Sequence, residues 1–211
     1  MGGCLDTERY LKSWQAEFWQ RVFRAELDYL VQRLWGSKDI LSVGCGPSII
    51  ESALSKRGFR VTGLDVSREA LGCAPDRNRA VVAQAEDMPF QESSFDAVIY
   101  IASLQFIEDY RKAIENTVRV LRPEGKLIVM LLNPESGFFR DRIRNIRSYV
   151  RKIRHKDINE IERMIEGKFQ VEVEYFLGVK GENIFESRDA ADAALYIIRG
   201  IKKVAKTGED E

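Results

Sequence analysis

Apolar residues from position 40 onward fall into short continuous runs that are separated by amphipathic stretches. The runs have the length of buried strands, and the stretches between them carry apolar residues at helical spacing. The strands expected from these runs are 40–43, 60–64, 80–83, 95–101 and 126–132. The helices expected between them are 49–56, 67–71 and 110–121. Strands that alternate with helices predict an α/β fold, in which a parallel sheet is covered by helices on both faces.

The pattern changes near the end of the chain. Residues 169–176 (FQVEVEYF) alternate apolar and polar side chains, as a half-exposed strand does, and residues 195–201 (LYIIRGI) could pair with them. We therefore expect a mixed sheet that is mostly parallel with an antiparallel edge strand.

Two amphipathic segments flank the alternating part. The N-terminal stretch 9–35 places Tyr10, Trp14 and Phe18 at intervals of four residues and continues as an apolar face. The second segment, 139–156, repeats apolar residues at helical spacing from Phe139 to Ile153, and arginines and lysines crowd its remaining positions. It predicts a basic amphipathic helix, which could recruit an anionic substrate, a phosphorylated carrier, nucleic acid or a membrane surface. A solvated face balanced by nearby acidic residues is the alternative.

A glycine-rich turn joins the first expected strand to the first expected helix. Gly44 and Gly46 stand at the carboxyl end of that strand, and Asp65 ends the second strand, 19 residues after Gly46. Glycines there allow a ligand to approach the backbone, and an acidic residue at that spacing commonly binds the hydroxyls of an adenosine ribose. The combination predicts a nucleoside cofactor. Dinucleotides and S-adenosylmethionine both use such a site. A dinucleotide would need a third glycine where Ile49 stands, which weakens the dinucleotide alternative without excluding it.

Five segments between Ile40 and Leu132 resemble the class I S-adenosylmethionine-dependent methyltransferases, in particular the group similar to the ubiquinone and menaquinone biosynthesis enzymes. The segments are VGCGPS, GLDVS, AEDMPF, FDAVI and VLRPEGKL, in the order and spacing of that family. The resemblance implies a Rossmann-like sheet of seven strands and S-adenosylmethionine as the cofactor, with S-adenosylhomocysteine as its product.

The resemblance also assigns roles to individual residues. Gly44, Cys45 and Gly46 would line the methionine part of the cofactor, Asp65 would hold the ribose, and Val66 would pack near the adenine. The adenine amino group would bind Asp87, helped by the backbone around Glu86 and Met88, and Ile101 and Ala102 would form the floor under the sulfonium. Candidate acceptor contacts are Tyr10, Trp14, Phe106 and Phe139.

The chain departs from the family pattern at three places. Ser42 occupies a position that is usually acidic, Ser48 replaces the usual third glycine, and Gln105 and Phe106 stand where histidine is frequent. Ser42 puts the contact to the cofactor's amino group in doubt. No catalytic base is identified, because an activated methyl group needs only a well-placed nucleophile. His155 lies far from the motifs in sequence, and solvent exposure is its expected state.

Composition limits the remaining options. Lysine and arginine total 33 and aspartate and glutamate total 33, so no overall charge steers the protein toward nucleic acid or a membrane. Three scattered cysteines without a CxxC motif fit a reducing cytoplasm and predict no metal site. No apolar run is long enough for a membrane span. We expect a cytoplasmic protein without stable nucleic acid binding; the sequence does not indicate its oligomeric state.

One domain is expected, with five parts. They are an N-terminal helical cap (1–36), a cofactor-binding core (37–132), a variable basic helical segment (133–168), C-terminal strands (169–203) and a tail (204–211). The predicted function is methyl transfer from S-adenosylmethionine to a small or carrier-bound acceptor. The alternatives are a catalytically inactive cofactor-binding or interaction module, suggested by Ser42, and a protein or RNA methyltransferase, suggested by the basic segment.

Overall fold

The computed structural model describes residues 16–74 and 79–203. Within them, eight strands form one sheet, in the spatial order β3-β2-β1-β4-β5-β8-β6-β7. In chain order the strands are β1 (Asp39–Val43), β2 (Arg60–Asp65), β3 (Ala80–Val82), β4 (Phe95–Ile101), β5 (Leu121–Leu132), β6 (Phe169–Lys180), β7 (Asn183–Phe185) and β8 (Ala193–Lys202). The expected α/β fold with a mostly parallel sheet is confirmed.

The expected antiparallel edge is confirmed, with β7 as the outermost strand, and only the number of strands differs. Strands β1 to β5 run parallel, whereas β8 lies antiparallel between β5 and β6 and is therefore not an edge strand. The predicted pairing of β6 with β8 is confirmed. The expected count of seven strands is too low, because β7 folds back on β6 as a hairpin after Gly181. Three residues are too few to produce a recognisable alternation in the sequence.

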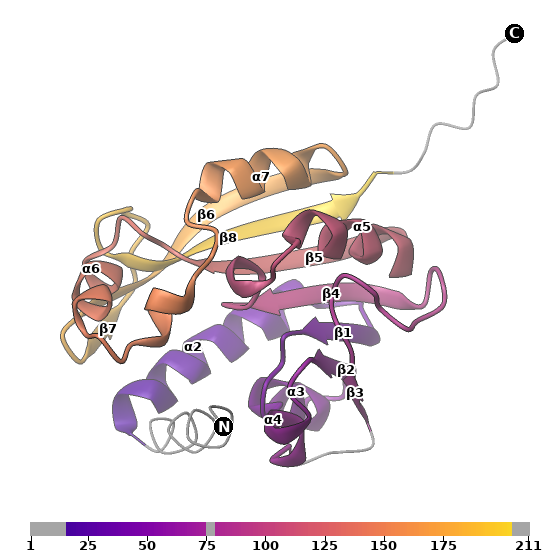
Figure 1. Cartoon of the computed structure of the whole chain (residues 1–211), viewed down its shortest axis with the longest axis horizontal. Helices are drawn as coiled ribbons and strands as arrows, with labels where there is room; N and C mark the ends of the chain where they lie inside the picture. The colour runs from indigo at the N-terminus through magenta and orange to yellow at the C-terminus, as the bar shows by residue number, and fades with distance from the viewer. Residues whose placement is uncertain (1–15, 75–78, 204–211) are drawn as a thin grey trace, which may run out of the picture.

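Helices cover both faces of the sheet (Figure 1). They are α2 (Glu17–Arg33), α3 (Ile49–Lys56), α4 (Arg68–Gly72), α5 (Tyr110–Val120), α6 (Gly137–Arg144) and α7 (Ile158–Glu166), with 3-10 turns η2 (Leu104–Phe106) and η3 (Tyr149–Lys152). Side chains alternate along β5: Leu127, Val129 and Leu131 pack on the face covered by α5 and α7, whereas Ile128 and Met130 pack toward α2 and α3. This alternation divides the core into two layers.

The continuous basic helix expected over 139–156 is not formed. Helix α6 ends at Arg144, residues 145–148 form a turn closed by the Ser148 amide and the Asn145 carbonyl at 3.0 Å, and η3 adds only one short 3-10 turn. The Asn145 side chain accepts a hydrogen bond from the Arg147 amide at 3.0 Å. Such local bonds compete with helix formation, and the helical repeat of apolar residues did not reveal them. Ile146, expected on the apolar face, is 81% exposed.

Helix α2 packs on the face of the sheet opposite to the one covered by α5 and α7. Leu30 is fully buried. Tyr29 packs its ring against Phe176 of β6, with centroids 4.9 Å apart, and its hydroxyl donates to Glu174 at 2.5 Å. The predicted acceptor contacts Tyr10 and Trp14 lie outside the described residues. No helix in residues 16–74 or 79–203 is long and apolar enough to cross a membrane.

Candidate functional site

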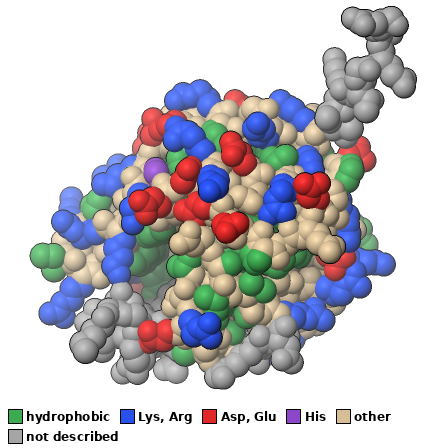
Figure 2. Space-filling view, turned by 45° about the vertical axis from the view of Figure 1, so that its right-hand side comes forward, with side chains coloured by type: hydrophobic (Ala, Val, Ile, Leu, Met, Phe, Trp, Pro, Cys, Tyr) green, Lys and Arg blue, Asp and Glu red, His purple; other side chains and the backbone are tan. Residues whose placement is uncertain are grey.

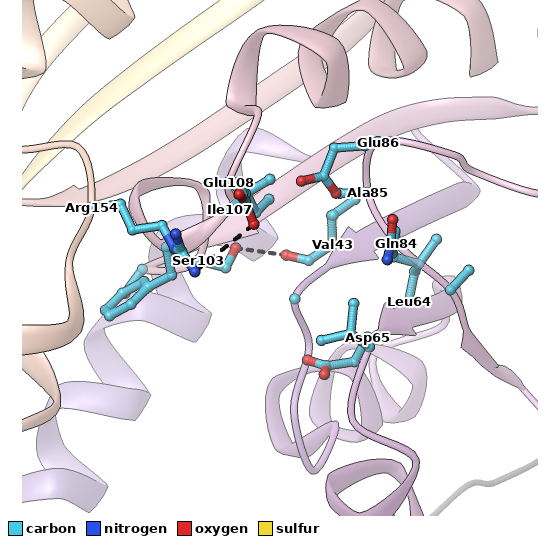
Figure 3. Close-up of a pocket in the computed structure, with 15 residues that line it drawn as sticks. Val43, Leu64, Asp65, Gln84, Ala85, Glu86, Ser103, Ile107, Glu108 and Arg154 are labelled. Carbon is cyan, nitrogen blue, oxygen red and sulfur yellow. Dashed lines mark hydrogen bonds and ion pairs between the residues drawn. The ribbon is translucent and has the colours of Figure 1, made fainter.

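A cavity of about 450 Å³ opens beyond the carboxyl ends of β1, β2 and β4 (Figure 3). Its position is where an open α/β sheet binds ligands, because β1 is flanked by β2 on one side and by β4 on the other. The lining residues are Val43, Gly44, Leu64, Asp65, Val66, Ala83, Gln84, Ala85, Glu86, Ala102, Ser103, Phe106, Ile107, Glu108 and Arg154. Cavities of this size commonly hold small molecules and cofactors.

Asp65 is fixed at the end of β2 by the backbone. One carboxylate oxygen accepts from the amide of Gly46 and the other from the amide of Ser67, each at 2.8 Å. A carboxylate oxygen has more than one acceptor position, so both oxygens can still receive a ligand hydroxyl. Asp65 is therefore a pre-oriented acceptor on the cavity wall.

The glycine-rich turn has left-handed backbone at alternate residues. The φ angles are +73° at Gly44, +52° at Gly46 and +53° at Ser48. Glycine adopts this conformation freely, which gives a physical reason for a third glycine where this chain has Ser48. A side chain at Gly44 is also excluded by space, because its Cβ would lie 2.5 Å from the Cβ of Ser103.

Ser103 links the carboxyl ends of β1 and β4. Its hydroxyl donates to the carbonyl of Val43 at 2.6 Å. The preceding residue, Ala102, has a left-handed φ of +47° and donates its amide to Met130 at 2.9 Å. A non-glycine residue in this conformation is strained, and such strain persists only where the surroundings enforce it. The floor of the cavity is thus set by fixed backbone.

The serine at the usually acidic position has a buried carboxylate partner. The Ser42 hydroxyl donates to Glu51 of α3 at 2.6 Å. Burial raises the pKa of Glu51 to about 7, although the hydrogen bond from Ser42 lowers it. Neither residue is in the cavity lining. A buried acid therefore lies next to Ser42, but it comes from α3 and is outside the cavity lining.

Helix α5 holds the loop that follows β3. The Asn116 side chain donates to the carbonyl of Glu86 at 2.9 Å. Arg119 donates to the carbonyls of Met88 at 2.7 Å and Phe90 at 2.6 Å. These bonds place Glu86 on the cavity wall, where its carboxylate accepts from the amide of Asp109 at 3.2 Å.

Gln105 ties η2 to two other segments. Its side chain is fully buried, accepts from the Leu132 amide at 2.7 Å and donates to the Leu132 carbonyl at 3.1 Å. Its own carbonyl accepts from the amides of Arg154 at 3.0 Å and His155 at 3.2 Å. The chain after η3 is thereby fixed across the cavity rim. His155 is half-buried rather than exposed, with its ring packed edge-on against Tyr110.

The structure brings only part of the predicted site to the cavity. The predicted residues in its lining are Gly44, Asp65, Val66, Glu86, Ala102 and Phe106. The lining does not include Cys45, Gly46, Asp87, Met88, Ile101 and Phe139. Among these, Met88 and Phe139 are buried in the core, Asp87 is exposed, and Gly46 acts through its bond to Asp65. Contact of any of these residues with a ligand stays a prediction.

Cys45 has a packing role. Its sulfur occupies the space beside Gly63 of β2, where a Cβ would lie 2.6 Å from it, and accepts from the Ser48 hydroxyl at 3.3 Å. Burial raises the pKa of this thiol, which opposes reactivity.

Sequence reasoning missed nine residues of the cavity lining. They are Val43, Leu64, Ala83, Gln84, Ala85, Ser103, Ile107, Glu108 and Arg154. The first eight lie in or close to recognised motifs, so extending each motif along its strand or loop could have found them. Arg154 had no such signal, because its position depends on a contact across the fold.

Known proteins similar to this chain agree on its class. Residues 41–129 match a family model described as a methyltransferase domain. The matched stretch is a little under half of the chain, and over it the chain is similar to a methyltransferase domain. A ubiquinone biosynthesis O-methyltransferase from Alkalilimnicola ehrlichii is 34% identical over 127 residues, which are 54% of this chain and 51% of that protein. A demethylmenaquinone methyltransferase from Corynebacterium glutamicum is 30% identical over 124 residues, 58% of this chain and 52% of that protein.

A solved structure has the same fold. It is a SAM-dependent methyltransferase from Thermotoga maritima, described as a possible histamine N-methyltransferase, with a TM-score of 0.77 and 20% identity. The alignment covers 93% of this chain and 95% of that one. The similarity to these methyltransferases implies S-adenosylmethionine as the cofactor. The chain spans about half the length of the curated relatives it matches.

The residues at the cavity fit this cofactor. Asp65 offers fixed acceptors to a ribose, and Gly44 leaves its face of the cavity free of any side chain. Within the described residues, no group of three or more His, Cys, Asp or Glu side chains could hold a metal ion.

Proposed function

We propose that this protein transfers a methyl group from S-adenosylmethionine to a small aromatic acceptor of the quinone type. The observation that supports it most is the pre-oriented Asp65 carboxylate at a cavity beyond β1, β2 and β4. The quinone-type acceptor is suggested by the names of the two curated relatives.

The residues of this chain would mainly bind and orient. Asp65 would accept the ribose hydroxyls, while Glu86 and Gln84 face the same cavity from the loop after β3. Ala102 and Ser103 would support the reacting end from below. S-adenosylmethionine supplies an activated methyl group on a sulfonium when it is bound. The chain's task is then to hold an acceptor in line and to exclude water.

Phe106 offers a surface for an aromatic acceptor. It is half-buried in the cavity lining, and its ring is stacked on Tyr149 of η3 at a centroid distance of 6.3 Å and an angle of 27°. A planar acceptor could extend this stack, since offset aromatic rings attract each other.

Transfer of labelled methyl from S-adenosylmethionine to a panel of hydroquinones and hydroxylated aromatic acids tests the proposal. We expect acceptor-dependent formation of S-adenosylhomocysteine by the wild-type protein and its loss in Asp65→Ala. Tight binding of the cofactor without turnover on any acceptor would favour an inactive binding module instead. Turnover only on RNA or protein would contradict the small acceptor.

A further inference from the structure

The two ends of the cavity differ in charge. Asp65 and Glu86 contribute carboxylates at one end, Arg154 reaches in from the opposite side, and Ser103 lies between them (Figure 3). Among the described residues that line the cavity, Arg154 is the one lysine or arginine. Asp65 and Glu86 suit the hydroxyl and amino groups of an adenosine, whereas Arg154, which forms an ion pair only with Glu108 among the described residues, suits an anionic group.

The Arg154 backbone is fixed, while its guanidinium is available. The amide is held by the Gln105 carbonyl at 3.0 Å. The guanidinium lies 4.0 Å from Glu108, and the side chains of Arg154 and Glu108 are 56% and 82% exposed. An ion pair so long and so exposed is weak. Five N–H donors in a planar fork are therefore directed at the cavity rim with little to bind, and this geometry matches a carboxylate.

The surroundings of Arg154 are apolar on the inside and charged on the outside. Phe106 lines the cavity beside it, backed by the ring of Tyr149. Figure 2 shows a hollow with a hydrophobic inner wall and lysine and arginine side chains along one rim. A flat ring bearing a negative group matches both features, because the ring can stack while its charge stays at the rim.

We propose that Arg154 binds a carboxylate carried by a planar aromatic acceptor whose ring lies against Phe106. This inference rests on the proposed function and specifies its acceptor. The methionine carboxylate of the cofactor has the same chemistry and is the rival ligand for Arg154, so the test must separate the two.

The test uses the full chain saturated with S-adenosylhomocysteine and titrated with 3-hydroxybenzoate or the uncharged 3-hydroxybenzyl alcohol. We expect the carboxylate to bind about tenfold more tightly than the alcohol, and Arg154→Gln to abolish this difference without affecting the alcohol. Glu108→Gln removes the competing carboxylate and should strengthen 3-hydroxybenzoate binding. Arg147→Gln, an exposed arginine of the same segment, is the matched control and should change neither probe.

Three outcomes would overturn the inference. The first is equal affinity of the wild-type protein for 3-hydroxybenzoate and 3-hydroxybenzyl alcohol, and the second is binding of neither compound. In both cases, intact binding of S-adenosylhomocysteine would leave the proposed function standing. The third outcome concerns Arg154→Gln and two ligands, S-adenosylhomocysteine and 5′-methylthioadenosine, of which the second lacks the amino acid. In this outcome the variant binds S-adenosylhomocysteine about tenfold more weakly than wild type does, but binds 5′-methylthioadenosine equally well. That result would assign Arg154 to the cofactor. Failure of the folded wild type to bind S-adenosylhomocysteine would instead contradict the proposed function itself.

Discussion

At the scale of single residues, the glycine turn allows a prediction with a built-in control. Gly44 and Gly46 both have left-handed φ, but only at Gly44 would a Cβ collide with a neighbour, Ser103. Gly46→Ala should therefore destabilise the fold by about 1 kcal/mol through backbone strain alone. Gly44→Ala should lower the free energy of unfolding by roughly 2–4 kcal/mol, because Ser103 and the Val43 carbonyl to which it donates must also move. Urea unfolding of the two variants measures the difference. Equal losses would contradict the close approach of β1 and β4.

Glu51 makes a prediction about pH. Burial raises its pKa from 4.5 to about 7 in the folded protein. As the pH rises, the unfolded chain therefore releases this proton at a lower pH than the folded protein does. The stabilisation is complete below pH 4.5 and is lost as pH rises through 7, by up to about 3 kcal/mol. Glu51→Gln keeps an acceptor for Ser42 and cannot ionise. It should match wild type near pH 5 and exceed its stability at pH 8. If the unfolding free energies of wild type and Glu51→Gln changed with pH in the same way, this result would contradict a raised pKa for Glu51.

At the scale of elements, Gln105 connects β5, η2 and the segment after η3. Gln105→Ala leaves the Leu132 amide and carbonyl buried without partners, so we expect a loss of about 2–4 kcal/mol. The Leu132 amide should also lose its protection from hydrogen exchange, whereas amides in the middle of β5 should keep theirs. Gln91→Ala, at an exposed position, is the control. Retained protection at Leu132 would show that another group can replace this bond.

At the scale of the whole molecule, a charged cluster and the cavity lie at opposite ends of the parallel strands. Asp39, Arg60, Asp96 and Arg122 form a charged cluster at the amino ends of β1, β2 and β4, with Arg122 3.3 Å from Asp39 and hydrogen-bonded to Asp96. The cavity lies beyond the opposite ends. Arg122→Ala should change the free energy of unfolding little, because solvent screens these partly exposed ion pairs. It should leave the affinity for S-adenosylhomocysteine unchanged in a calorimetric titration. A substantial loss of affinity would contradict this separation.

The sequence predicted the parts of the molecule that depend on local patterns. Buried runs such as KLIVMLL and the spacing from Gly46 to Asp65 are properties of neighbouring residues, and they located β5 and one wall of the cavity. The place of β8 in the sheet depends on which distant strands pair, which periodicity does not encode. The same limit hid Arg154, because its position is set by the buried carbonyl of Gln105.

The measurement that tests the central claim most directly is a calorimetric titration of wild type and Asp65→Ala with S-adenosylhomocysteine. The variant loses the carboxylate that is fixed by the amides of Gly46 and Ser67, so its affinity should fall by roughly 10- to 100-fold. Glu92→Ala, an exposed acid, is the control, and thermal unfolding verifies that each variant is folded. NAD should not bind. Equal affinity of wild type and Asp65→Ala, or no binding by folded wild type, would contradict the assignment of this cavity to the methyl donor.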